Sequence, residues 1–150
     1  MKLKSYLTAI VTMISSVTFA QHFSMSGSYS PTFDSYSLGF GFGDKDLLMD
    51  YKFGISDEFF SFGLDLGFQI VDFKPRNGIS VLYLGFGGEM YLMDDVDRDL
   101  GYSIYPSMSI SYNQFVLTYG YGFYEYDGDP IGDLDAYHML KLTIIFADID

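Results

Sequence analysis

Five charged residues lie in segments that otherwise alternate between large apolar residues and Ser or Gly. They are Asp50, Lys52, Asp65, Glu89 and Lys141. Because each stands at a Ser or Gly position, we expect all five on one face of their segments, opposite the apolar residues. Three carboxylates beside two ammonium groups suit a gated ion path or a catalytic acid–base pair. They also suit a paired, hydrogen-bonded network that fills an interior, where unpaired charge is costly. We favour this interior polar network.

A second cluster of carboxylates lies near the C-terminus, in the stretch DGDPIGDLDAYH. Its members are Asp127, Asp129, Asp133 and Asp135. Calcium and magnesium ions prefer carboxylate oxygens, and the Asp-x-Asp opening is that of an EF-hand loop. The rest of that motif is missing, because Ile131 stands at a ligand position and His138 at the place of the closing Glu. We therefore expect no EF-hand and no resident cofactor, with at most a loosely bound Ca²⁺ or Mg²⁺ at these acidic loops.

The residue types needed for nucleophilic catalysis are scarce. The chain has no Cys and two histidines, His22 and His138. Neither belongs to a His-x-Ser pair, and a hydrolase needs a nucleophile, a base and an orienting group within reach of one another. The glycines of SLGFGFG are spaced two apart, so they do not match the G-x-G-x-x-G fingerprint of a nucleotide site. We expect no enzymatic activity, and both histidines at the rim of the fold.

Composition and the N-terminus limit the class of protein further. A chain of 150 residues has room for one domain. Its net charge of -12, with eight Lys and Arg in all, argues against a nucleic-acid partner. Lys2 and Lys4 precede a mostly apolar run that ends in Thr-Phe-Ala at Ala20, which is the pattern of a secretory signal peptide. The sequence therefore predicts a signal peptide over residues 1–20 and one exported domain over residues 21–150.

The segments that position the charged residues alternate with a period of two, which is typical of β-strands. In residues 60–70, large apolar residues at the even positions oppose Ser, Gly, Asp and Gln at the odd positions. Eight segments follow this pattern: 22–30, 35–43, 47–55, 60–70, 82–92, 103–112, 115–123 and 140–146. Short links such as Asn113-Gln114 alternate with longer ones at 94–101 and 126–136. This alternation predicts an up-and-down barrel with two different ends.

The faces of these strands predict where the barrel lies. The Ser and Gly face carries too few charges to be the surface of a soluble protein, and a narrow barrel has little room inside for rows of Phe, Tyr and Leu. We therefore predict an all-β fold, a closed up-and-down antiparallel transmembrane β-barrel with eight strands and its apolar face toward lipid. Tyrosines near the strand ends suit the aromatic girdles of such a barrel: Tyr29, Tyr36, Tyr91, Tyr102, Tyr112 and Tyr126. A β-sandwich or a soluble lipid-binding barrel is the alternative.

With this pattern, and with a last strand YHMLKLTIIF that ends in an aromatic residue at Phe146, the chain resembles a known family. These are the small eight-stranded outer-membrane β-barrel proteins of Gram-negative bacteria, of the OmpA/OmpX type. The chain departs from the family in the ADID that follows Phe146 and in its lack of Trp. The resemblance implies a periplasmic N-terminus, outward-facing acidic links, and assembly by the barrel-assembly machinery into outer-membrane lipid and lipopolysaccharide.

The function that we expect is a non-enzymatic role in the envelope or in surface interaction. We expect a monomer with a plugged interior, of which a narrow pore is a weaker variant. Two alternatives remain, a lipid A-modifying outer-membrane enzyme and a secreted soluble barrel that binds an apolar ligand.

Overall fold

The computed structural model describes residues 22–44, 46–57, 59–73, 80–95, 98–126 and 135–146. The expected signal peptide over residues 1–20 lies outside these ranges. No helix within them is long and apolar enough to cross a membrane.

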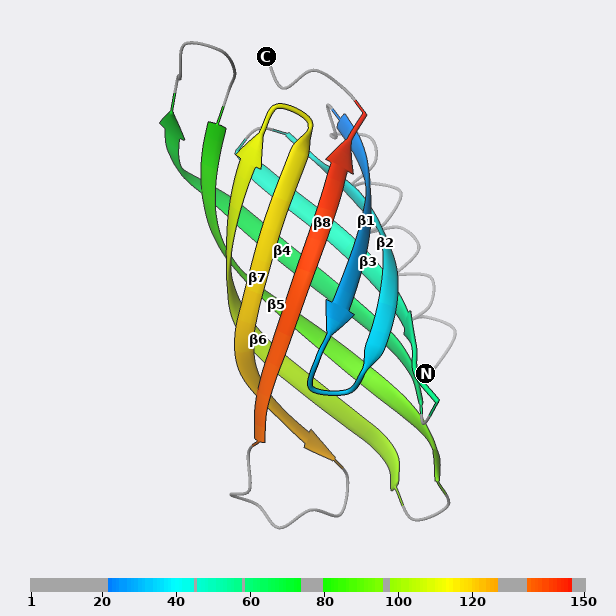
Figure 1. Ribbon diagram of the computed structural model, residues 1–150. Helices are drawn as coiled ribbons and strands as arrows, with labels where there is room; N and C mark the ends of the chain where they lie inside the picture. The colour runs from blue at the N-terminus through cyan, green and yellow to red at the C-terminus, as the bar shows by residue number, and fades with distance from the viewer. Residues whose placement is uncertain are drawn as a thin grey trace, which may run out of the picture.

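Eight antiparallel strands close into one barrel (Figure 1). Each strand pairs with its neighbour in the chain, and the last strand returns to pair with the first. The strands are β1 His22–Ser30, β2 Ser35–Gly43, β3 Leu47–Ile55, β4 Phe59–Phe73, β5 Ser80–Asp95, β6 Arg98–Tyr112, β7 Phe115–Tyr126 and β8 Asp135–Ile145. The prediction of a closed, all-β, up-and-down antiparallel barrel with eight strands is confirmed.

The two faces of each strand follow the alternation in the sequence. In β1, the serines at positions 24, 26, 28 and 30 are buried, while Phe23, Met25 and Tyr29 on the other face are exposed. Small polar residues fit the narrow interior of an eight-stranded barrel, so the large apolar residues lie on its outer face. The interior of this molecule is therefore mainly polar, and most of its apolar side chains lie outside.

The tight turns are stabilised by side-chain hydrogen bonds and by residues in the left-handed backbone conformation. Asn113 begins the two-residue turn between β6 and β7 with a φ of 52°, a conformation that Asn adopts more readily than most residues. At the turn after β2, the carboxylate of Asp44 accepts hydrogen bonds from the backbone N–H groups of Asp46 at 2.9 Å and Leu47 at 2.8 Å. Both turns lie where the sequence predicts short links.

The barrel has two different ends (Figure 1). At the terminus end, the odd-numbered strands begin and the even-numbered strands end; at the loop end, the odd-numbered strands end and the even-numbered strands begin. The β1–β2 hairpin is short, so its turn lies closer to the middle of the barrel than the β5–β6 hairpin does (Figure 1). The prediction of a long link over 94–101 is wrong, because pairing continues to Asp95 and Arg98.

Candidate functional site

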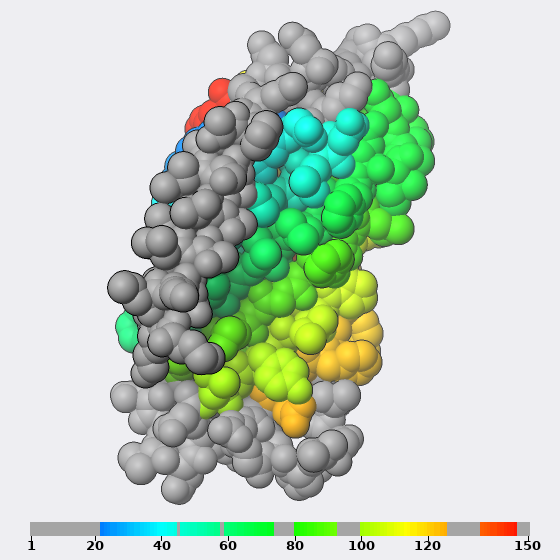
Figure 2. All heavy atoms as spheres, turned by 180° about the vertical axis from the view of Figure 1, so that it is seen from behind, coloured from blue at the N-terminus to red at the C-terminus, as the bar shows by residue number. Residues whose placement is uncertain are grey.

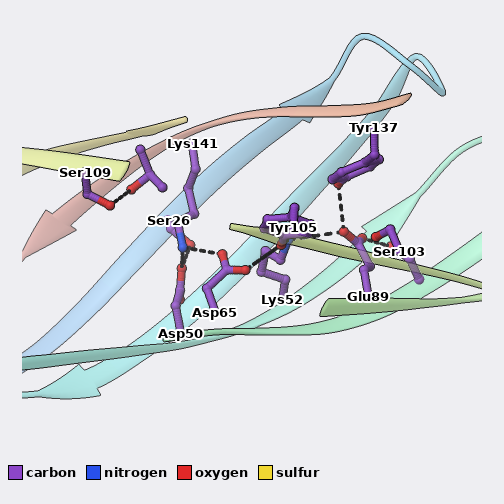
Figure 3. A network of polar contacts seen from close by, with 12 residues as sticks. Ser26, Asp50, Lys52, Asp65, Glu89, Ser103, Tyr105, Ser109, Tyr137 and Lys141 are labelled. Carbon is purple, nitrogen blue, oxygen red and sulfur yellow. Dashed lines mark hydrogen bonds and ion pairs between the residues drawn. The ribbon is translucent and has the colours of Figure 1, made fainter. Parts of the chain in front are cut away.

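The five charged residues predicted for the interior lie together inside the barrel (Figure 3). We call Asp50, Lys52, Asp65, Glu89 and Lys141 the charge network; each has an exposed fraction of 5% or less. They come from four strands, β3, β4, β5 and β8. Neighbouring strands supply most of them, and Lys141 reaches the others from β8, so the network crosses the interior.

Charges of opposite sign alternate through the network. The Lys141 ammonium group lies 2.9 Å from an oxygen of Asp50 and also forms an ion pair with Asp65. The Lys52 ammonium group lies 3.5 Å from Asp65 and 3.1 Å from Glu89. Each lysine thus bridges two carboxylates, and Asp65 is shared by both lysines. Such pairing offsets part of the desolvation cost of burying the charges.

Hydroxyl groups complete most of the hydrogen bonds of the three carboxylates. Ser26 donates to Asp50 Oδ2 at 2.6 Å, and Tyr105 donates to Asp65 Oδ1. Glu89 accepts a hydrogen bond from Ser61. It also accepts one from Tyr137 at 3.1 Å (Figure 3). The Lys52 ammonium group also lies 4.9 Å from the centre of the Tyr105 ring, within cation–π range.

Glycines make room for the long side chains of the network. Gly63 pairs with Lys52 on one side and with Glu89 on the other, and Gly87 pairs with Asp65 and Tyr105. A Cβ atom at Gly87 would lie 2.2 Å from Asp65 Oδ1 and 2.4 Å from the Tyr105 ring. The alternating glycines of the sequence are therefore a packing requirement at this position.

Aromatic rings fill the interior on the loop-end side of the charge network. This aromatic plug consists of Phe33, Phe59, Tyr91, Tyr105, Tyr124, Tyr137 and Met139. The ring of Phe33, from the β1–β2 turn, lies in its centre, with centroids 5.4 Å from Phe59, 5.0 Å from Tyr91, 4.7 Å from Tyr124 and 5.8 Å from Tyr137. Because the β1–β2 hairpin is short, its turn places this ring inside the loop end.

Sequence reasoning missed most of the plug. Tyr91 was predicted to lie in an outer girdle, and that prediction is wrong: its side chain is 1% exposed and its hydroxyl donates to Ser103 at 2.7 Å. The reason is the two-residue period of a strand: Tyr91 is two residues from Glu89, so both side chains point inward. Phe33 was not predicted, since no strand pattern covers a turn. The other girdle candidates Tyr29, Tyr36, Tyr102 and Tyr112 are exposed, and the side chain of Tyr126 lies outside the described part.

Small hydroxyl residues line the interior on the terminus-end side of the network. We call Ser24, Ser107, Ser109, Thr118 and Thr143 the hydroxyl half; all are buried. Thr118 donates to Ser109 at 2.8 Å. These residues, with Asp50, Asp65 and Lys141, line a cavity of about 30 Å³. The sequence predicted small residues here, but nothing in it predicted the cavity.

The two histidines lie apart from the charge network. His22 begins β1 at the rim, with its side chain buried rather than free. His138 lies on β8, where its Nδ1 is 2.9 Å from the Tyr119 hydroxyl and its ring centroid is 5.0 Å from that of Tyr121. Within the described residues, no hydrogen bond or ion pair of the network involves either histidine.

The acidic cluster near the C-terminus is largely outside the described part of the chain. Asp127, Asp129 and Asp133 lie there, and Asp135 begins β8 with a side chain that is not described. In the ranges that the structure covers, no group of three or more His, Cys, Asp or Glu side chains is placed to hold a metal ion. A loosely bound Ca²⁺ or Mg²⁺ at these loops stays a prediction.

No model of a known protein family matches this chain, and neither a curated protein nor a solved structure matches it. Fold and interior geometry therefore carry the functional interpretation. They define a closed eight-stranded barrel with a plugged loop end, a charge network at mid-height and a small polar cavity beside it.

Proposed function

We propose that this chain is a small integral β-barrel of the outer membrane, with a non-enzymatic role in the envelope or in surface interaction. The observation that carries the proposal is the inverted distribution of side chains. Lys52 is 0% exposed inside the barrel, whereas Leu38 is 69% and Phe60 is 64% exposed on the outside. A soluble barrel would reverse this arrangement.

The outer surface is apolar around the barrel. Exposed apolar residues lie on all eight strands, and side chains of β3 to β6 cover the face shown in Figure 2. Among strand residues outside the interior whose side chains are described, the charged ones are Asp72 and Glu125, close to the ends of β4 and β7. A hydrocarbon layer tolerates such a surface, and closure of the barrel pairs the backbone groups that lipid could not solvate.

Exposed tyrosines lie at both ends of this apolar surface, at a separation that suits a membrane. Tyr102 and Tyr112 lie near the two ends of the apolar part of β6 and are 43% and 53% exposed. At ~3.3 Å per residue and a tilt of ~40°, they are about 25 Å apart along the barrel axis. The apolar band of an outer-membrane barrel is also about 25 Å tall. The tyrosines therefore suit the two interfaces of a membrane.

The interior favours a plugged barrel over an open channel. The aromatic plug fills the loop end, and the charge network crosses the middle. The cavity beside the charge network has a volume of about 30 Å³, which is room for only about two water molecules. We therefore propose a role that uses the outer loops or the envelope position, not conduction. In this proposal the barrel is a monomer, assembled by the barrel-assembly machinery into outer-membrane lipid, with acidic loops toward lipopolysaccharide.

Cell fractionation and gel mobility test this proposal together. We expect the chain, expressed with its residues 1–20 in a Gram-negative host, in the outer-membrane fraction of a density gradient. We also expect unboiled samples to migrate differently from boiled ones in detergent gels, because folded barrels resist unfolding by detergent. Recovery as a soluble periplasmic protein would contradict the proposal. A changed lipid A profile on expression would favour the enzymatic alternative instead.

A further inference from the structure

We propose that the interior of the barrel binds one monovalent cation of about the size of sodium. The site is the cavity between the charge network and the hydroxyl half, and its principal ligand is the free carboxylate oxygen of Asp50. The site lies inside the barrel, so it does not depend on the proposed membrane location.

The charge balance of the interior favours an added positive charge. The charge network holds three carboxylates and two ammonium groups, which leaves one negative charge in excess within the described interior. Both lysines are already shared, since Lys141 bridges Asp50 and Asp65 while Lys52 bridges Asp65 and Glu89. Excess charge in a low-dielectric interior is costly, so a cation that reaches it is bound favourably.

One carboxylate oxygen is placed to receive that cation. Asp50 Oδ2 accepts from Ser26 at 2.6 Å and lies 2.9 Å from the Lys141 ammonium group. Asp50 Oδ1 has no hydrogen-bond partner among the described residues, although the side chain is only 7% exposed. Buried carboxylate oxygens are normally satisfied, which makes this oxygen an acceptor with lone pairs available for a ligand.

The surroundings of this oxygen are those of a site for a small hard cation. The cavity that Asp50 lines has a volume of about 30 Å³, and the five hydroxyl side chains of the hydroxyl half line it together with apolar side chains such as Leu48 and Val116. A Cβ atom at Gly39 would lie 2.8 Å from Asp50 Oδ1, and one at Gly41 would lie 3.4 Å from this oxygen and 2.1 Å from Ser24 Oγ, so Asp50 Oδ1 lies over this pair of glycines with Ser24 Oγ beside it. Carboxylate and hydroxyl oxygens are hard ligands, which suit hard cations.

The charge of the site selects a monovalent ion over a divalent one. Lys141 also lines the cavity and repels cations, but its ammonium group lies against Oδ2, not against the free Oδ1. A single positive charge neutralises the interior, whereas a divalent ion would leave it positively charged beside Lys141.

Unfolding in different salts tests the site. The folded protein is unfolded with urea at pH 8, where the imidazole of His22 is neutral, and followed by circular dichroism. Sodium chloride is compared with N-methyl-D-glucamine chloride at equal ionic strength, so that screening of surface charge is matched. At a sodium concentration ten times Kd, we expect sodium to lower the unfolding equilibrium constant about 11-fold.

Three variants locate the effect. Asp50→Asn removes the ligand charge, and we expect the sodium effect to disappear. Ser24→Ala keeps every charge and removes one hydroxyl, so the effect should weaken by more than half; it also serves if Asp50→Asn does not fold. Asp72→Asn is the matched control, because it removes an exposed carboxylate of β4, and we expect it to keep the full effect.

Two outcomes would overturn the proposal. One is equal stability of the unsubstituted protein in both salts. The other is a sodium effect that persists unchanged in both Asp50→Asn and Ser24→Ala.

Discussion

The two halves of the barrel interior are filled in different ways. On the loop-end side, large rings pack against one another around Phe33. On the terminus-end side, five serine and threonine side chains are among the residues that line a cavity of about 30 Å³. The charge network lies between them and contacts both.

This difference decides how each half supports the charge network. On the plug side, Tyr105 and Tyr137 combine large buried area with hydroxyls that donate to Asp65 and Glu89. On the hydroxyl side, Ser26 donates to one oxygen of Asp50 and the other has no partner among the described residues. The same barrel thus has a tightly packed half, and a half with room for a ligand.

The largest effect is expected from the lysine that borders the hydroxyl half. Lys141→Met removes the ammonium group shared by Asp50 and Asp65 and should lower the free energy of unfolding by about 4 kcal/mol, as for other broken buried ion pairs. Lys52→Met is the matched change on the plug side. Lys52→Met should lower the free energy of unfolding by about 3 kcal/mol. The loss is smaller because Asp65 still accepts a hydrogen bond from Tyr105, and Glu89 still accepts from Tyr137 and Ser61.

The difference between the two losses of stability is measured by urea unfolding of both lysine variants under identical conditions, in buffer without sodium. An equal or larger loss in Lys52→Met would contradict the idea that the plug side supports its carboxylates better.

The next effect concerns the ring at the centre of the plug. Phe33→Ala removes contacts with four aromatic rings, and we expect a loss of about 2 kcal/mol, less than for a fully buried Phe, since Phe33 is partly buried. Phe33→Leu is the control that keeps apolar volume, and it should retain more than half of that stability. Thermal unfolding followed by circular dichroism compares the two, and equal losses would show that ring packing is unimportant.

A pair of glycines on adjacent strands gives a more local test. Gly87→Ala places a methyl group 2.2 Å from Asp65 Oδ1, and we expect a loss of about 2 kcal/mol from overpacking. Gly67→Ala is the same change beside the cavity, where the nearest atom would lie 3.6 Å away, so the stability should change by less than about 0.5 kcal/mol. Comparable urea midpoints for the two variants would contradict the difference in packing between these two positions.

The sequence predicted the barrel and the charge network for the same physical reason. Side chains of a strand point to alternate faces, so Asp50 and Lys52 had to share a face, and a glycine-lined face had to be the narrow one. Tyr91 lies near a strand end, as girdle tyrosines do, but it is two residues from Glu89, so its side chain points inward. The prediction of a long link over 94–101 was wrong because the backbones of β5 and β6 stay paired whether or not their side chains alternate.

Other features depend on tertiary structure and could not be predicted from local pattern. Phe33 enters the plug because the β1–β2 hairpin is short enough to place its turn at the mouth of the barrel. The free oxygen of Asp50 depends on the positions of Ser26 and Lys141, which come from other strands. Sequence alternation places a residue on a face, but it does not show which atoms lack a partner.

The smallest effect of removing an interaction is expected inside the hydroxyl half. Thr118→Val keeps the shape of the side chain and removes its hydrogen bond to Ser109, so we expect a loss of about 1 kcal/mol in sodium-free buffer. Combining it with Ser109→Ala removes both partners, and the double variant should lose less than the sum of the single variants. A double-mutant cycle in urea measures this coupling. If the losses simply add, the hydroxyls act independently, and the hydroxyl half is a set of small residues that fill space rather than a hydrogen-bonded lining.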